Sequence, residues 1–335
     1  MKRLRQLSNF VLIVMALAFC ASVPAQQPLL KQVQTIPLDD VEGRFDHFAI
    51  DVRAKRLYIA ALGNNSLEVI DTEAGKRIKS ISGLREPTGV RVLSDGKVVV
   101  ASGGDGKLRA YDKDLKLVAT LDQLDDADNV RLGAQGKLVF VGYASGAIAI
   151  IDPQATRKIG QIKLDGHPEA FQLESVGSRI FVNVPTAKQI AVLDRNARST
   201  LAKWPLADAQ ANFPMALDEA SHRLFVGCRK PAKLLVLDID SGKVVSSIDC
   251  CGDTDDLYFD RDAKRIYISG GEGFVSVIGQ SDADHYTLLD RIPTAAGART
   301  SIFVPETRLL YLAVPHRGEQ KAELRVYQAV KPAPG

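Results

Sequence analysis

The sequence repeats one short pattern seven times, and this repeat constrains the fold more than any other feature. A basic residue precedes an alternating apolar run, and the spacing between successive copies is 40–44 residues: Arg56, Lys97, Lys137, Arg179, Arg223, Arg265 and Arg308. A second apolar run follows about ten residues later and ends in Asp in five copies: Asp71, Asp112, Asp152, Asp194 and Asp238. Such alternation predicts strands. Because turn residues follow these aspartates, we expect their side chains to cap turns.

A period of about 42 residues has room for four short strands, which is typical of a propeller blade. The sequence therefore predicts an all-β fold, a seven-bladed β-propeller of four-stranded antiparallel blades. The seventh repeat ends after its third strand, near Tyr327, and an unmatched apolar segment at residues 31–37 precedes the first repeat. We expect this N-terminal strand to complete the last blade and close the ring, which would remove two free sheet edges.

The N-terminus has the features of a secretory signal peptide over residues 1–25. Three basic residues precede an apolar run at residues 10–19, and small residues lead to Ala25. We expect cleavage near Ala25, a periplasmic or secreted location, and a single propeller domain over residues 26–335. The alternative is a lipoprotein carrying its lipid on Cys20, but Phe19 stands where such signals have a small residue.

Charge argues against general binding of nucleic acids. Residues 1–25 contain three basic and no acidic residues, so the rest of the chain carries 40 basic and 40 acidic residues. A protein that binds nucleic acids without sequence preference needs an excess of basic residues on one face. No later stretch approaches the ~20 apolar residues of a membrane helix. We expect the mature protein to lack a transmembrane segment and to be a monomer.

Two segments of the chain resemble a known repeat. Residues 57–60 (Leu-Tyr-Ile-Ala) and 67–76 resemble the YVTN-type repeat of YncE-like bacterial β-propellers, and residues 235–245 match it best. The resemblance covers about residues 31–328. It implies the propeller fold and an exported protein, and it implies no particular chemistry.

Ligands usually bind a propeller where its variable loops meet at one mouth of the central channel. The loop that enters each innermost strand and the loop between the second and third strands lie on that face. We therefore predict a ligand-binding site formed by Arg44, Asp46, His47, Asn129, His167, Glu169, Asn212, Asp253, Asp255, Asp256, Arg299, His316 and Arg317.

The residue types in these loops suit two kinds of chemistry. A divalent metal is the cofactor that the sequence suggests. Histidine with carboxylates favours a transition metal, with His47, His167 and Glu169 as ligands, whereas the Asp, Glu and Asn side chains alone would suit Ca²⁺. Arginines such as Arg44 and Arg299 could hold a carboxylate or phosphate group. We expect a scaffold that binds a small molecule or a protein partner at the mouth. The alternatives are a metal-assisted, lactonase-like hydrolase using the same mouth, and polar groups that merely satisfy one another around a wet channel.

Three cysteines follow the predicted signal peptide. An oxidising compartment favours one disulfide between Cys228 and either Cys250 or Cys251, and the sequence leaves the partner open. A ring between the vicinal Cys250 and Cys251, binding of a soft metal by thiolates, and plain reduced thiols are the alternatives. A redox protein that uses these three thiols is a third functional hypothesis.

Overall fold

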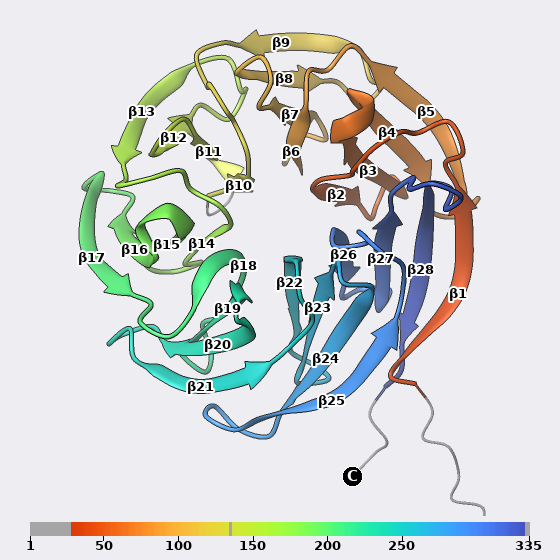
Figure 1. The fold of residues 1–335 in the computed structure, drawn as a ribbon. Helices are drawn as coiled ribbons and strands as arrows, with labels where there is room; N and C mark the ends of the chain where they lie inside the picture. Colours follow the sequence, from red (N-terminus) through yellow and green to blue (C-terminus); the bar gives the residue numbers. More distant parts are fainter. Residues whose placement is uncertain (1–27, 134–135, 332–335) are drawn as a thin grey trace, which may run out of the picture.

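The computed structural model describes residues 28–133 and 136–331, and in these residues 28 strands form seven four-stranded antiparallel sheets arranged in a ring (Figure 1). The prediction of a seven-bladed propeller is confirmed. The predicted signal peptide over residues 1–25, with Cys20 and the cleavage near Ala25, lies outside the described residues. No helix among the described residues is long and apolar enough to span a bilayer.

Each blade is one sheet, numbered here from the N-terminus, and its strands run from the channel outward. Blade 1 comprises β2 (Phe48–Asp51), β3 (Arg56–Ala61), β4 (Ser66–Asp71) and β5 (Lys76–Ser82), and blade 2 comprises β6 (Pro87–Val92), β7 (Val98–Ser102), β8 (Lys107–Tyr111) and β9 (Leu117–Leu121). Blade 3 comprises β10 (Val130–Leu132), β11 (Val139–Tyr143), β12 (Ala147–Ile151) and β13 (Lys158–Lys163). Blade 4 comprises β14 (Phe171–Leu173), β15 (Arg179–Val184), β16 (Gln189–Asp194) and β17 (Ser199–Pro205).

Blades 5 and 6 comprise β18 (Gln210–Asp218), β19 (Arg223–Lys230), β20 (Ala232–Asp238) and β21 (Val244–Asp249), and β22 (Thr254–Asp260), β23 (Arg265–Gly270), β24 (Phe274–Gln280) and β25 (Tyr286–Pro293). Blade 7 contains β26 (Ser301–Val304), β27 (Leu309–Val314) and β28 (Glu323–Ala329), with β1 (Leu30–Pro37) as its outer strand. The short 3-10 turns η1 (Leu62–Asn64) and η3 (Pro185–Ala187) lie in second-to-third strand loops.

The ring closes as the sequence predicts. Strand β1 pairs antiparallel with β28, from Leu30 opposite Ala329 to Pro37 opposite Glu323, with a bulge at residues 32–34. Figure 1 shows β1 as the outer strand of the last blade, beside β28. The first and last strands of the ring are therefore held in one sheet.

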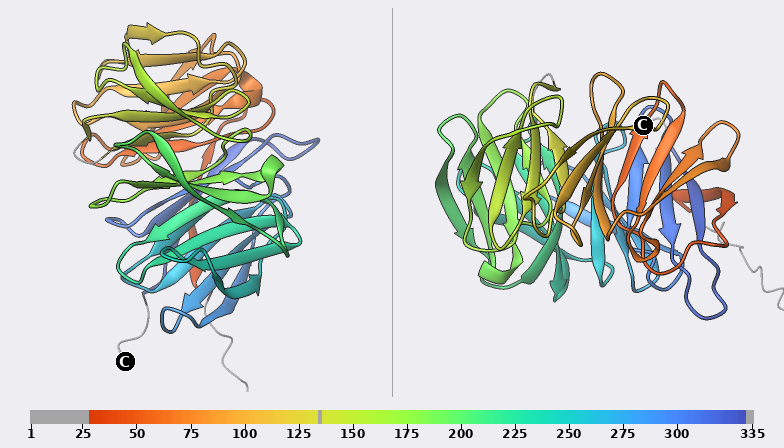
Figure 2. Two further views of the ribbon diagram at one scale, coloured as in Figure 1. Left: turned by 90° about the vertical axis from the view of Figure 1, so that its left-hand side faces the viewer. Right: turned by 90° about the horizontal axis from the view of Figure 1, so that it is seen from above.

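The hydrophobic core consists of apolar layers between neighbouring blades. Seven clusters of buried residues occupy the seven interfaces. Between blades 1 and 2, for example, Tyr58, Leu67 and Val69 pack against Val98 and Val100, all at most 2% exposed. Each blade is covered by a neighbouring blade on both of its faces. Its second and third strands are therefore apolar on both sides, which explains the apolar runs in each repeat. Figure 2 shows the ring from the side, with strands running between its two faces.

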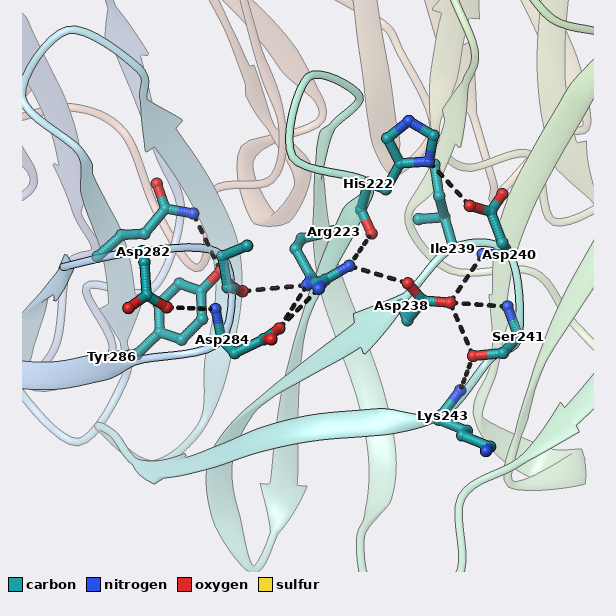
Figure 3. A network of polar contacts seen from close by, with 12 residues as sticks. His222, Arg223, Asp238, Ile239, Asp240, Ser241, Lys243, Asp282, Asp284 and Tyr286 are labelled. Atoms are coloured by element: carbon teal, nitrogen blue, oxygen red, sulfur yellow. Dashed lines mark hydrogen bonds and ion pairs between the residues drawn. The ribbon is translucent and has the colours of Figure 1, made fainter.

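The basic residue of the repeat acts between blades. In four copies its guanidinium reaches the turn after the third strand of the next blade: Arg56 to Lys113 O, Arg179 to Ile239 O, Arg223 to Asp284 and Arg265 to Val330 O. Figure 3 shows the copy between blades 5 and 6. These contacts lie at the start of the second strands, on the face opposite the entry loops, which we call the far face.

The repeated aspartates cap turns, as predicted. Asp238 Oδ1 accepts hydrogen bonds from the backbone N–H groups of Asp240 and Ser241 (3.2 and 2.9 Å), as Figure 3 shows. The four other aspartates make the same kind of contact. Asp238 Oδ2 also accepts from Arg223 Nη1 at 2.9 Å, so the turn cap and the contact between blades form one network.

We predict that Arg223→Gln lowers the free energy of unfolding by about 1–2 kcal/mol, because charge-assisted hydrogen bonds to Asp238 and Asp284 and one to Ala283 O are lost. The carboxylate of Asp284 is half-exposed, which limits its share. The measurement is urea unfolding followed by circular dichroism. Arg53→Gln, at an exposed position in the β2–β3 turn, is the control and should change stability little. Equal effects of the two substitutions would contradict the role of Arg223.

Candidate functional site

The fold brings seven entry loops to one mouth of the channel. The innermost strands β2, β6, β10, β14, β18, β22 and β26 surround the channel in Figure 1, and each begins at the same face. Residues from all seven blades line a cavity of about 280 Å³ there: Arg44, Asp46, His47, Thr88, Asp126, Ala127, Asp128, His167, Glu169, Phe213, Arg229, Asp255 and Arg299. We call this the mouth cavity.

His47 is held in the mouth cavity by its own backbone. Asp46 N donates to Ala60 O (2.8 Å) and Ala60 N donates to His47 O (3.1 Å), which extends the β2–β3 pairing into the entry loop. The flanking Phe45 and Phe48 are buried in the layer between blades 7 and 1. With Phe45 and Phe48 buried on either side, Asp46 and His47 line the mouth cavity.

The imidazole of His47 lies among three carboxylates. Its Nε2 is 3.6 Å from Asp46 Oδ1 and 3.6 Å from Asp128 Oδ1, and its Nδ1 is 3.6 Å from Asp256 Oδ1. Asp256 Oδ2 accepts a hydrogen bond from Ser301 N at 2.8 Å, which fixes that carboxylate. The Nδ1 side of His47 therefore has a fixed carboxylate, and its Nε2 faces the cavity acids.

His167, from blade 4, is arranged in the same way around the other oxygen of Asp128. Its Nδ1 is 2.7 Å from Ala144 O and 3.2 Å from Asp126 Oδ2, and its Nε2 is 3.8 Å from Asp128 Oδ2. In metal sites a histidine usually donates one ring N–H to a carbonyl or carboxylate and binds the metal through the other nitrogen. His167 has this arrangement through Ala144 O, whereas the 3.6 Å between His47 Nδ1 and Asp256 Oδ1 is longer than a hydrogen bond. The Nε2 atoms of both histidines lie toward Asp128.

Asp128 joins two groups of possible metal ligands. The donor atoms of Asp46, His47 and Asp128 lie within 4.8 Å of one another, as do those of Asp128, His167 and Glu169. The structure thus distributes the sequence-predicted ligands His47, His167 and Glu169 over two triads. Asp128 was not among the residues selected from the sequence, and the two histidines and acids that it faces come from blades 1 and 4.

The carboxylates of the mouth cavity differ in their affinity for protons. Burial acts against ionisation of Asp128, but contacts with His167 and His47 lower its pKa. Burial raises the pKa of Asp46 to about 7, and repulsion by Asp128 and Asp255 adds to this effect. Burial and repulsion by Asp128 raise the pKa of Glu169 to about 8. Burial alone would lower the pKa of His47, but Asp46, Asp256 and Asp128 raise it to about 10. The hydrogen bond to Asp128 raises the pKa of His167 to about 9. A bound cation would relieve the repulsion.

The arginines at the rim are already paired with acids. Arg299 forms two hydrogen bonds to Asp253 (2.9 and 3.0 Å) and contacts Asp255 at 3.1 Å. Arg229 donates to Asp255 at 2.7 Å and lies over the ring of Phe213, 3.6 Å from its centroid. An anion that bound to Arg299, as predicted, would therefore have to compete with Asp253 and Asp255 for its guanidinium group.

Six predicted residues do not line the mouth cavity: Asn129, Asn212, Asp253, Asp256, His316 and Arg317. Asp256 lines the neighbouring cavity instead, and Asp253 pairs with Arg299. Asn129 and Asn212 are buried, and Asn212 Nδ2 donates to Asn183 Oδ1 (2.8 Å) and Gln189 O (3.1 Å) between blades. His316 contacts Glu42 at 2.7 Å, and Arg317 pairs through its backbone with Gln320 in the β27–β28 loop. The cavity instead contains Thr88, Asp126, Asp128, Phe213 and Arg229.

Cys228, Cys250 and Cys251 are buried and free in this structure, so no bridge between them is formed among the described residues, and the disulfide stays a prediction. Burial raises the pKa of all three thiols, to about 12 for Cys228. Because thiol reactivity and soft-metal binding need the thiolate, these environments do not favour either one.

Comparison with solved structures shows the class of protein. The chain is similar to a chain of hydrazine synthase from Kuenenia stuttgartiensis (TM-score 0.72, 15% identity, 82% of this chain and 93% of that chain). It is also similar to a chain of the mitotic checkpoint complex (TM-score 0.75, 15% identity, 97% of this chain and 100% of that chain). At this identity the likeness shows the seven-bladed propeller fold alone. No family model and no curated protein matches the sequence.

We predict that the metal-free protein loses stability as pH rises from 6 to 9. The pKa values of Asp46, Glu169, His47 and His167 are all raised above their unfolded values, so the native state binds more protons in this range and its stability falls with pH. A fall of at least about 1.4 kcal/mol, equivalent to one pKa unit, should appear in urea unfolding across this range.

The variant His167→Asn should flatten this pH dependence, because it removes one of the four groups. The control His222→Asn changes an exposed histidine on the far face and should keep the wild-type slope. Stability that rises with pH in the metal-free wild type would contradict this account of the site.

Proposed function

We propose that the protein is an exported, YncE-like propeller that binds divalent transition metal ions at its channel mouth and, through them, a small ligand. The export signal in residues 1–25 and the YVTN-like repeat support the location and the family. The observation that carries the function is the position of Asp128, whose two carboxylate oxygens each face the Nε2 atom of a different histidine.

This geometry favours one ion in each triad, with Asp128 as a bridging ligand. Two donors of a single ion lie at most about 4.3 Å apart, twice the usual ~2.1 Å between metal and donor. The two histidines belong to different triads, and each triad supplies one imidazole and one carboxylate besides Asp128. Mixed nitrogen and oxygen donors favour Zn²⁺, Mn²⁺ or Fe²⁺ over Ca²⁺, which prefers six to eight oxygens. The hydrogen bond between His167 Nδ1 and Ala144 O preorganises one of the two imidazoles.

The size of the mouth cavity favours a small molecule as the ligand. About 280 Å³ is near the lower end of the range for small-molecule sites. Arg44 is exposed at the edge of this cavity and could contact an acidic group of the ligand, since Arg229 and Arg299 already have internal partners.

We predict that the purified protein, dialysed against Zn²⁺ and desalted, retains two ions per chain. Asp128→Asn should lose both, with at least a tenfold drop in retained metal, because the bridging carboxylate belongs to both triads. The measurement is native mass spectrometry together with elemental analysis. Asp122→Asn is the matched control, since Asp122 is exposed and contacts only Lys107 among the described residues. A wild type without metal, or equal retention in both variants, would contradict the proposal.

Hydrolysis is the second candidate, and the shared carboxylate favours it. A pair of divalent ions can polarise a carbonyl or phosphoryl oxygen and activate water when bound. Glu169 belongs to one of the triads and would hold an ion there, while burial keeps it largely protonated near neutral pH when no ion is bound. Arg44 could orient an acidic substrate.

We expect a Zn²⁺-loaded hydrolase to act on a panel of lactones, p-nitrophenyl acetate and p-nitrophenyl phosphate. Asp128→Asn should lower kcat/KM at least 100-fold, because it removes both ions, and Asp122→Asn should leave it unchanged. Equal rates for the two variants would place any turnover outside this site. No turnover by the loaded wild type on the whole panel would favour ligand binding without catalysis.

A further inference from the structure

The middle of the channel contains a second group of charged side chains that the mouth does not use. Arg91 on β6 pairs with Val99, and Arg131 on β10 pairs with Phe140, at equivalent positions of neighbouring blades. Gln172 on β14 and Tyr258 on β22 occupy the same level in their blades. Strands β6 and β10 are adjacent around the channel in Figure 1. We call Arg91, Arg131, Gln172 and Tyr258 the waist.

Two cavities meet at the waist. One, of about 180 Å³, is lined by Arg131, Gln172 and Tyr258 and reaches His47. The other, of about 320 Å³, is lined by Arg91 and Tyr258 and by apolar residues such as Ile302. Because Tyr258 lines both cavities, Arg91 and Arg131 both face the space beside this tyrosine. His47 lines the mouth cavity as well, so the waist adjoins the mouth.

The two arginines at the waist lack the acidic partners that the rim arginines have. Within the described residues neither guanidinium forms an ion pair with a carboxylate, although Glu306 lines the same cavity as Arg91. Arg131 donates to the neighbouring Val130 O at 3.0 Å and lies 5.6 Å from the ring centroid of Phe171. Asp256, which lines the same cavity as Arg131, already contacts Ser301 N and His47. The two positively charged guanidinium groups therefore lie on the same side of the channel, and some of their N–H donors have no partner among the described residues.

We propose that the waist binds a small oxoanion group, carboxylate or phosphate, between Arg91 and Arg131. Arginine is suited to this role, because its planar guanidinium can form two parallel hydrogen bonds to such a group. Tyr258 donates its hydroxyl to Ser301 O (2.8 Å), and Gln172 donates to Met215 O (2.8 Å), so both side chains are fixed in position around the space.

The electrostatics of the waist agree with this assignment. Burial lowers the pKa of Arg91, and the charge of Arg131 lowers it further. Burial likewise lowers the pKa of Arg131. An anion between the two guanidinium groups would remove their repulsion. This site uses residues outside both metal triads, so it does not depend on the proposed metal.

The test is isothermal titration of EDTA-treated protein with inorganic phosphate and, separately, with succinate, at constant ionic strength set with KCl. We expect one binding site for at least one of these probes, and at least a tenfold weaker Kd in Arg91→Gln and in Arg131→Gln. Arg157→Gln, an exposed arginine of blade 3, is the matched control and should bind as the wild type does. Binding of phosphate alone or of succinate alone would identify which oxoanion the waist prefers.

Thermal unfolding supplies a readout that does not require a measurable heat of binding. Saturating probe should raise the Tm of the wild type and of Arg157→Gln, and should raise that of the waist variants by less than half as much. Without probe, the waist variants should unfold at the wild-type Tm or above it, because repulsion is relieved. No binding of either probe by the wild type, or equal binding by wild type and waist variants, would overturn the proposal. Because the protein is free of metal, a failed metal site would not affect this result.

Discussion

The arrangement of seven blades with the same polarity around one axis determines where this protein can carry out chemistry. Every innermost strand begins at the same face, so the entry loops of all blades converge on one mouth, although they lie about 42 residues apart in sequence. No single loop contains a complete site. His47 comes from blade 1, Asp128 precedes blade 3 and Glu169 precedes blade 4, and only the ring brings them within contact distance. A rigid scaffold of this kind can hold ligands in fixed positions at little cost in conformational entropy.

Charge is balanced differently at the two faces and along the channel. On the far face the arginines of the repeat meet carbonyls and carboxylates of the next blade, so their charge is used in holding the ring together. At the mouth acidic and basic side chains are mixed, whereas at the waist the arginines have no ion-pair partner among the described residues. A path through the channel therefore passes from a region of mixed charge to a positive region, and His47 lines both cavities. This order favours a ligand that carries an acidic group and can also contact a cation.

The sequence was sufficient to predict the fold because every repeat carries the same pattern. The period gave the number of blades, the missing fourth strand of the last repeat gave the closure by residues 31–37, and the aspartates gave the turns. The site was harder to predict, because residues in one entry loop point to different places. Asn129 follows Asp128 directly, yet Asn129 is buried and Asp128 lines the cavity. His316 and Arg317 lie on the predicted face but too far from the axis. Arg91 and Arg131 lie inside strands, and without known strand register they could not be distinguished from surface arginines.

Blade 7 is assembled from both ends of the chain, and this determines when the protein can complete its fold during synthesis. Its outer strand is the first of the chain and its other three strands are the last, so pairing between residues 30–37 and 323–329 joins segments almost 290 residues apart. A ribosome adds residues from the N-terminus, so for nearly all of synthesis β1 has no partner strand and blade 1 has no blade 7 to pack against. The ring can close only when β28 has been made. Until then β1 has to stay extended and soluble, and its exposed lysine and glutamines at positions 31, 32 and 34 suit an edge strand that waits for its partner.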